Sequence, residues 1–373
     1  MCGIVGYVGY KPVVDILLDG LEQLEYRGYD SSGIAVKCTD SIKVYKAEGK
    51  LVNLREELAP HAYEISKATL GIGHIRWATH GAPTVVNAHP HTCGCGKLVV
   101  VHNGIIENYK DIKKFLIGKG YSFVSETDTE TVAKLLDYYY DGDPVGAIIK
   151  TLNDIRGAYA LGILFKDFPD KIFAVRKDSP LIIGVGDEEN FIASDVPAIL
   201  QYTRKYYLLE ENEIATIKAD RVEFCDIHKQ EIIKEVKESD LDMDAAEKGG
   251  YEHFMLKEFH EQPTAVKTTI APRIIDGMPN LSECGMTKED LKNYRKIFIV
   301  ACGTAMHAGM VGKYVIEKLA RTEVTVDIAS EFRYRDPIIG KDDLMVVVSQ
   351  SGETADTKAA LQLAHERGAE VLS

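Results

Sequence analysis

The residue with the most reactive chemistry in this chain is Cys2, in the opening MCGIVGYVG. If Met1 is removed, a thiol and a free α-amine belong to the same residue, and an α-amine with a pKa of about 7.7–8.0 accepts a proton near neutrality. A terminal amine is one way to activate an adjacent nucleophile. The alternative is a buried cysteine on a first strand, because residues 4–8 have the composition of a strand. The motifs downstream favour the nucleophile.

Polar residues recur downstream in types that suit an amino-acid substrate. Arg76 can hold a carboxylate through two parallel hydrogen bonds, and Asp128 can bind an α-ammonium group. Asn103 and Gly104 end an apolar strand with an amide donor and an unhindered backbone N–H, a pair able to stabilise an oxyanion. The segments concerned are CGIVGYVG from Cys2, LEYRGYDSSGIAV at 24–36, GHIRWATHG at 73–81, HNGIIENY at 102–109 and SETDTE at 125–130.

Together these segments resemble the class II glutamine amidotransferases, whose N-terminal-nucleophile fold is an αββα sandwich. The resemblance implies that Cys2 attacks the side-chain amide of glutamine, and that its own α-amine relays the proton to the leaving ammonia. It also implies a glutamine site made of Arg76, Trp77, Thr79, His80, Gly104 and Asp128, with Asn103 and Gly104 as the oxyanion hole. Trp77 matches the tryptophan that gates ammonia passage in the class. Without the resemblance, ordinary core packing is the simpler role for this single tryptophan.

A second constellation lies near the end of the chain, at Ser349-Gln350-Ser351-Gly-Glu-Thr354. Its hydroxyls follow an apolar strand and open a helix, so free N–H groups and hydroxyls surround a site that suits a phosphate monoester. The alternative is a helix start capped for purely structural reasons. The position at the carboxyl end of a strand fits the rule for ligand crevices in open sheets, and we expect a phosphate site.

The turn Cys302-Gly-Thr304-Ala-Met opens a second helix beside this one, and the two turns resemble the sugar-isomerase (SIS) domain. The resemblance implies that Thr304 contacts the sugar, and that Ser349, Gln350, Ser351 and Thr354 contact the phosphate and nearby hydroxyls. Ala305 stands where the family commonly has a serine, which puts one contact in doubt. The two halves in this order resemble the glutamine–fructose-6-phosphate aminotransferase family. Glutamine and fructose 6-phosphate are then the expected ligands, with no cofactor and a homodimer in the intact protein.

Composition limits the partners and the compartment. The chain has 373 residues, with 44 Lys and Arg against 57 Asp and Glu and a net charge of −13. An acidic balance argues against nucleic acid and anionic membranes as partners. No apolar run reaches membrane-spanning length, and the N-terminus lacks the pattern of a signal peptide, so we expect a cytoplasmic enzyme.

The seven cysteines do not form the pattern of a secreted disulfide framework. One cluster, His89-Pro-His91-Thr-Cys93-Gly-Cys95, places four potential zinc ligands within seven residues. Structural zinc sites usually space their ligand pairs more widely, and the proline and glycines favour a turn. We therefore expect a reduced loop and no metal.

The sequence predicts two domains that differ in their order of strands and helices. Residues 1–225 predict a sheet-rich α+β domain, and residues 226–250 are acidic and polar, as expected of a linker. Residues 251–373 alternate strands and helices as in a doubly wound α/β unit, which here is incomplete because the last segment enters the sheet as a strand. The helix expected over Glu252–Ile270 is interrupted at Pro263.

Two other functions remain open from the sequence. Another class II amidotransferase would share the first half, although the phosphoribosyl-diphosphate loop of the amidophosphoribosyltransferases is missing. A sugar-phosphate-sensing module with an inert first domain is the other hypothesis, and Cys2, Arg76 and Asp128 argue against inertness. In the family, the lysine and the acid and base of sugar isomerisation follow the last residue of this chain. We therefore expect at most glutamine hydrolysis and weak sugar-phosphate binding here.

Overall fold

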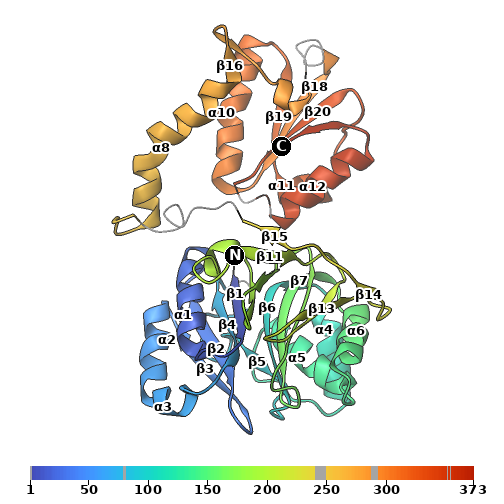
Figure 1. The fold of residues 1–373 in the computed structure, drawn as a ribbon. Coiled ribbons are helices and arrows are strands. Elements are labelled where there is room, and N and C mark those ends of the chain that lie inside the picture. Colours follow the sequence, from blue (N-terminus) through green and yellow to red (C-terminus); the bar gives the residue numbers. More distant parts are fainter. Residues whose placement is uncertain (1, 79–80, 240–248, 287–292, 351, 353) are drawn as a thin grey trace. The chain divides into compact units, whose positions relative to one another are not determined.

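The computed structural model describes residues 2–78, 81–239, 249–286, 293–350, 352 and 354–373. Contacts between residues divide the chain into two compact units, Met1–Glu247 and Lys248–Ser373 (Figure 1). Within the described residues, no helix combines the length and the apolar character that crossing a membrane requires.

The first unit contains two antiparallel sheets. The eight-stranded sheet has the order β15-β11-β9-β10-β1-β4-β2-β3, and the seven-stranded sheet has the order β14-β13-β12-β8-β7-β6-β5. The strands are β1 (Gly3–Val8), β2 (Ser31–Lys37), β3 (Ile42–Glu48), β4 (Leu70–Arg76), β5 (His91–Thr92), β6 (Leu98–Ile106), β7 (Gly157–Phe165), β8 (Ile172–Lys177), β9 (Ile182–Val185), β10 (Asn190–Ala193), β11 (Lys205–Leu208), β12 (Ile214–Ile217), β13 (Val222–Cys225), β14 (Glu231–Ile232) and β15 (Lys237–Glu238).

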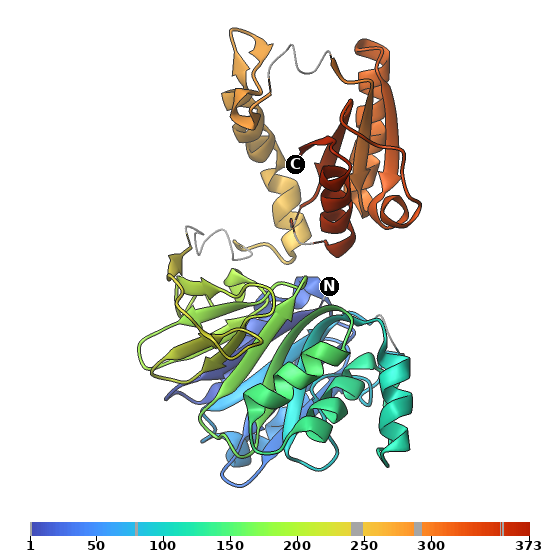
Figure 2. The same cartoon turned by 90° about the vertical axis from the view of Figure 1, so that its right-hand side faces the viewer.

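Helices cover the outer face of each sheet, so the unit is a four-layer αββα sandwich (Figure 1). The first sheet carries α1 (Val13–Gln23), α2 (Leu51–Leu58) and α3 (Ala62–Ile65). The second carries α4 (Tyr109–Gly118), α5 (Asp128–Tyr139) and α6 (Pro144–Asp154), which face the viewer in Figure 2. The fold predicted from the N-terminal motifs is confirmed.

Three apolar layers hold this sandwich together. One lies between α1, α2 and the first sheet, with Leu17 and Ile34 at 0% exposure. A second lies between the two sheets and includes Ile4 and Val101. A third lies between the second sheet and α4–α6, around Leu136. Because β1 and β6 belong to different sheets and share the middle layer, their ends are brought to the same region.

Part of the stretch 226–250, which the composition indicates as a linker, contributes strands to the first unit. Two short strands lie in the stretch 226–250: β14 pairs with β13, and β15 pairs with β11. β14 is an edge strand of the seven-stranded sheet, and β15 is an edge strand of the eight-stranded sheet. The division of the chain by contacts falls between Glu247 and Lys248. A polar composition does not exclude edge strands, because one face of such a strand is exposed to solvent.

The second unit is a four-stranded parallel sheet in the order β19-β18-β20-β21. Its elements are α8 (Phe254–Ile270), β16 (Ile274–Ile275), β17 (Met278–Pro279), β18 (Lys296–Ala301), α10 (Gly303–Leu319), β19 (Glu323–Ile328), α11 (Ala329–Tyr334), β20 (Asp343–Val348), α12 (Ala355–Glu366) and β21 (Glu370–Leu372). The expected interruption of α8 is wrong: the helix continues through Pro263, although an interior proline removes one backbone hydrogen bond and crowds the preceding turn.

Helices lie on both faces of this parallel sheet. Successive strand residues point to opposite faces. Phe298 and Val300 of β18 pack with α11 and α12 in one cluster, whereas Ile299 between them faces α10, where a Cβ on Gly309 would come within 2.7 Å of its side chain. The predicted doubly wound arrangement is confirmed.

Candidate active site

Cys2 lies directly before β1, beside the end of the antiparallel strand β4, because Gly3 pairs with Ile75. The backbone N–H of Trp77 donates to the Cys2 Sγ at 3.3 Å, and the thiol contacts the Trp77 carbonyl at 3.5 Å. Burial raises the pKa of the thiol; the Trp77 backbone N–H and Arg76 oppose this effect, and Asp128 adds to it. The nucleophile expected from the sequence is therefore half-buried and needs a base to ionise.

Arg76, the last residue of β4, is buried and held by the loop that follows it. Its Nη1 and Nη2 donate to the carbonyls of Ala82 and Gly81, each at 3.2 Å. These contacts fix the guanidinium beside Cys2. Thr79 and His80, which the sequence also placed in the glutamine site, lie outside the described residues.

Asn103 comes from the other sheet and reaches the Cys2 backbone. Its Nδ2 donates to the Cys2 carbonyl at 3.2 Å and to the Ser194 Oγ at 2.8 Å. The Ser194 Oγ also accepts from the backbone N–H of Ile4 at 2.8 Å, which ties it to β1. Ser194 carries no sequence signal for this role, since it lies 91 residues from Asn103. Of the two Asn103 contacts, the longer one to Cys2 is the contact that a substrate oxyanion could replace.

His74 is a second residue that sequence reasoning missed. Its Nε2 lies 3.0 Å from the His102 carbonyl and 3.0 Å from the Asn103 Oδ1. Both atoms accept, so Nε2 carries the hydrogen and the Asn103 amide is oriented with its N–H groups toward Cys2. A histidine inside the otherwise apolar stretch 70–75 was the available signal in the sequence.

Burial lowers the pKa of His74 to about 3, even though the hydrogen bonds to residues 102 and 103 favour the charged ring. An unfolded histidine titrates near 6.5, so the unfolded chain takes up this proton first as the pH falls. The contribution of His74 to stability is therefore complete above about pH 6.5 and declines progressively toward pH 3.

Gly104 follows Asn103 with φ +129°, a conformation that L side chains rarely adopt. A Cβ there would lie 2.0 Å from the Ala158 carbonyl oxygen of the neighbouring strand β7. A glycine is required at this position for both reasons.

Asp128 begins α5 and is buried, with its Oδ2 accepting from the backbone N–H of Ile106 at 2.8 Å. The side chain of Thr127 caps this helix by accepting from the Glu130 backbone N–H. Negative charge is favoured at a helix N-terminus. Among the described residues, no cationic side chain forms an ion pair with the Asp128 carboxylate. The carboxylate at the recess is therefore open to a cationic ligand.

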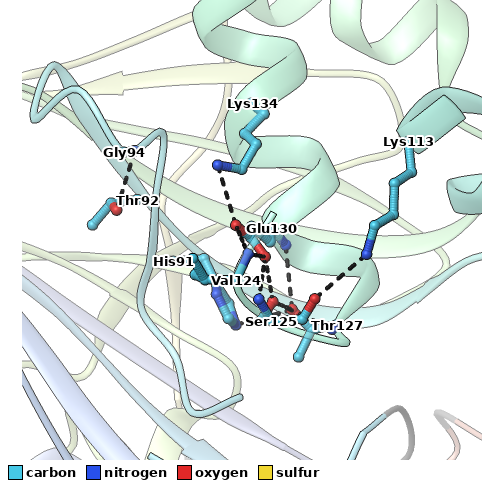
Figure 3. A network of polar contacts seen from close by, with 9 residues as sticks. All are labelled: His91, Thr92, Gly94, Lys113, Val124, Ser125, Thr127, Glu130 and Lys134. Atoms are coloured by element: carbon cyan, nitrogen blue, oxygen red, sulfur yellow. Dashed lines mark hydrogen bonds and ion pairs between the residues drawn. The ribbon is translucent and has the colours of Figure 1, made fainter. Parts of the chain in front are cut away.

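Glu130 organises the segment that presents Asp128 (Figure 3). Its carboxylate accepts from the Ser125 backbone N–H at 2.6 Å, from the Ser125 Oγ at 2.7 Å and from the Val124 backbone N–H at 3.0 Å, and it pairs with Lys134 at 3.1 Å. Burial alone would raise the pKa of Glu130, but these partners outweigh it and hold the pKa below its usual value. The loop before α5 is thus tied to the helix itself.

One recess brings most of the expected residues together. It is lined by Cys2, Arg76, Trp77, Gly104 and Asp128, and also by His89, His102, Thr127 and Thr129. A cation, a carboxylate and a thiol thus share one small pocket. That combination suits a ligand carrying both an α-carboxylate and an α-ammonium group.

Trp77 is 48% exposed at the rim of this recess, so it is not a core residue. Its ring meets Tyr29 edge to face at a centroid distance of 6.3 Å. The segment is anchored by Asp30, whose carboxylate accepts from the Ala78 backbone N–H at 2.8 Å. The packing role that the sequence left open for this tryptophan is wrong.

The four possible zinc ligands of the 89–95 segment separate into two groups. The His91 Nε2 lies 3.1 Å from the Thr127 Oγ1, and the His89 Nε2 lies 3.3 Å from the Thr129 Oγ1. Burial lowers the pKa values of both rings well below the usual range. Both histidines are therefore neutral rings that contact the two threonines on either side of Asp128, and Cys93 and Cys95 lie apart from them beside Asp137.

In the second unit, the two predicted turns lie at one edge of the sheet. Ala301 and Val348 are paired neighbours at the carboxyl ends of β18 and β20, so the turns that follow them are adjacent. Thr304, Ser349 and Gln350 are exposed, and Thr354 is half-buried as the residue before α12. The Ser349 Oγ accepts from the Gly352 N–H at 3.0 Å. Ser351 lies outside the described residues.

Comparisons with known proteins find a matching domain family in each of the two units. A glutamine amidotransferase domain matches residues 83–201, and a SIS domain matches residues 290–373. The whole chain is 58% identical to the glutamine--fructose-6-phosphate aminotransferase [isomerizing] of Caldanaerobacter subterraneus subsp. tengcongensis and 54% identical to that of Clostridium acetobutylicum.

Over its whole length the chain is similar to these two aminotransferases. It spans 61% of the length of these two relatives. Among solved structures, the glutamine phosphoribosylpyrophosphate amidotransferase of B. subtilis has a TM-score of 0.52 at 18% identity, covering 99% of this chain and 80% of that one. At that identity the likeness shows the fold alone.

Proposed function

We propose that the first unit hydrolyses glutamine to glutamate and ammonia, with Cys2 as the nucleophile. The observation that carries the proposal is the shared recess, whose walls include Cys2, Arg76, Gly104 and Asp128. Arg76 would hold the glutamine α-carboxylate and Asp128 its α-ammonium group, which leaves the side-chain amide directed to the thiol.

The proposed reaction has two stages. With Met1 removed, the Cys2 α-amine takes the thiol proton as Sγ attacks the amide carbon, and the Asn103 Nδ2 and Gly104 N–H stabilise the oxyanion. The same proton passes to the amide nitrogen, ammonia leaves and a glutamyl thioester remains. Water then attacks the thioester, releasing glutamate and restoring the thiol.

For the intact protein we propose transfer of this ammonia to fructose 6-phosphate, with formation of glucosamine 6-phosphate. The family of the relatives and the adjacent turns after β18 and β20 support a sugar-phosphate site in the second unit. Thr304 would contact the sugar, and Ser349, Gln350, Ser351 and Thr354 the phosphate and nearby hydroxyls. Trp77, exposed at the rim of the first recess, would gate the release of ammonia.

The proposed role of Asp128 predicts a specific change in substrate affinity. In Asp128→Asn, the amide oxygen can still accept from Ile106, whereas the charge that attracts an ammonium group is lost. A hydrogen bond to a charged group contributes about 1.5–3 kcal/mol, so KM for glutamine should rise roughly 10- to 100-fold with a smaller change in kcat. Glutamate release measured against glutamine concentration gives both constants.

Glutaramate, which has the side-chain amide and the carboxylate but no α-amine, is the matched control substrate. Wild type and Asp128→Asn should hydrolyse glutaramate with similar kcat/KM. If the variant loses as much activity on glutaramate as on glutamine, Asp128 acts through the structure of the site and not on the ammonium group.

The phosphate site is tested by Ser349→Ala. Calorimetric titration with fructose 6-phosphate should show binding to the chain that weakens about tenfold in the variant, since a hydroxyl hydrogen bond to an anion is lost. Ser282→Ala, which removes an exposed hydroxyl of the second unit outside the two turns, is the control and should bind as wild type does. Equal affinity of Ser349→Ala and wild type would place the phosphate elsewhere.

We also propose that the intact protein is a homodimer that works in the cytoplasm. Val311, Tyr314 and Leu319 of α10 are 63%, 72% and 76% exposed and share helical spacing, which supports a partner for this apolar face. All seven cysteines are free, which supports a reducing compartment. Sedimentation of the intact protein at the mass of one chain would contradict the dimer, and disulfides in protein isolated under thiol-trapping conditions would contradict the compartment.

A further inference from the structure

Cys93, Cys95 and Asp137 form a cluster that the proposed reaction does not use. Their Sγ and carboxylate oxygen atoms all lie within 4.8 Å of one another. Around one tetrahedral zinc ion, with bonds of about 2.0–2.3 Å, ligand atoms lie roughly 3.3–3.8 Å apart. Small side-chain movements are therefore enough to bring the three atoms onto a common centre.

The fold brings these groups together from separate elements. The two cysteines lie where β5 ends and in the turn before β6, in which Gly94 and Gly96 have φ of +86° and +74°. Asp137 is in the last turn of α5 and only 9% of its side chain is exposed. The sequence motif lacked this third ligand, because it lies 42 residues beyond Cys95.

The carboxylate of Asp137 is already oriented toward the cysteines. The Tyr121 hydroxyl donates to its Oδ2 at 2.9 Å, which leaves Oδ1 facing the turn. Oδ1 accepts from the Cys95 thiol at 3.2 Å and lies 3.2 Å from the Lys97 Nζ. The Lys97 side chain is 53% exposed, so it can move into solvent when Oδ1 takes another partner.

The chemistry of this set favours a soft divalent metal over thiol redox chemistry. A thiol that donates to a carboxylate is protonated and is a poor nucleophile. A bound divalent ion reverses this preference, because it deprotonates a coordinating thiol outright. Two thiolates and a carboxylate carry three negative charges, which one divalent ion and the neighbouring Lys97 ammonium balance.

We propose that Cys93, Cys95 and Asp137 bind one thiophilic divalent ion of the Zn²⁺ type, with water as the fourth ligand. The ion would join the β5–β6 turn to the end of α5. These two elements also meet beside the recess that Cys2 lines, where His91 contacts Thr127. The site is a structural clip outside that pocket, and it does not depend on the proposed glutamine hydrolysis.

The test is a Cd²⁺ titration of the 373-residue chain in a phosphine reductant, followed by the ultraviolet charge-transfer absorption of cadmium thiolates. All proteins carry Cys2→Ser, which removes the one other thiol that we place in a polar pocket. The absorption should rise to a plateau at one ion per chain. Cys93→Ser and Cys95→Ser should each weaken binding at least tenfold, and Asp137→Asn should weaken it less. Cys284→Ser removes an exposed free thiol and should bind Cd²⁺ as tightly as the parent, which is the chain carrying Cys2→Ser alone.

A second readout is independent of thiolate absorption. Zn²⁺ should raise the Tm of the parent, as a ligand of the folded state does, and should not raise that of the Cys93→Ser/Cys95→Ser double variant, whose folding is checked by circular dichroism. Three results would overturn the proposal: no absorption at one equivalent of Cd²⁺, absorption that persists in the double variant, or a metal-free chain that is two hydrogens lighter and regains them on reduction, which indicates a disulfide.

Discussion

Replacing Cys2 with alanine is expected to reduce glutamine hydrolysis by roughly 10⁴-fold or more. No other thiol of the described residues lines the recess with Arg76 and Asp128, and losses of this size follow when a covalent nucleophile is removed. The measurement is glutamate release from glutamine at saturating concentration. Cys38→Ala, which removes a half-buried thiol of the same unit, is the matched control and should keep wild-type activity.

A chain that retains Met1 should be as inactive as Cys2→Ala, although its thiol is intact. The nitrogen of Cys2 is then an amide, which cannot accept the thiol proton, and burial already raises the pKa of that thiol. Mass spectrometry separates the two forms, and the activity of a mixed preparation should follow the processed fraction. Hydrolysis by a preparation made only of the Met1-retaining form would contradict the α-amine mechanism.

Replacing Asn103 with alanine is expected to lower kcat by roughly 10²–10³-fold with little change in KM, as the loss of one oxyanion donor does. The Nδ2 of Asn103 donates to the Cys2 carbonyl at 3.2 Å, which places this amide beside the nucleophile. The glutamine carboxylate and ammonium group would still meet Arg76 and Asp128, so ground-state binding remains. A rise in KM with unchanged kcat would contradict the oxyanion role.

Asn103→Ala also tests whether His74 acts through Asn103. His74→Phe removes the donor to the Asn103 Oδ1 and frees the amide to rotate, so we expect kcat to fall about tenfold. In the Asn103→Ala background, the His74 substitution should cause little further loss, because coupled residues are not additive. Equal effects of His74→Phe in both backgrounds would show that His74 only supports the fold.

How far the site could be predicted depends on where its residues lie in the chain. Cys2, Arg76, Gly104 and Asp128 carry recognisable chemistry in short motifs, and the structure places all four on one recess. Ser194 carries none, because a lone serine after a strand has no pattern. The same is true of Asp137, which meets Cys95 only because α5 packs beside the β5–β6 turn.

Resemblance to known families implied the N-terminal sandwich, and the sequence by itself determined most of the element types and the residues able to perform the chemistry. These depend on local periodicity and on side-chain type, which a short stretch of chain displays. Only the tertiary structure decided which way the Asn103 amide faces, that Trp77 is exposed, and that the histidines of the 89–95 segment lie apart from its cysteines. Each of these depends on contacts between residues distant in the chain, and such contacts exist only once the two sheets and their helices have packed.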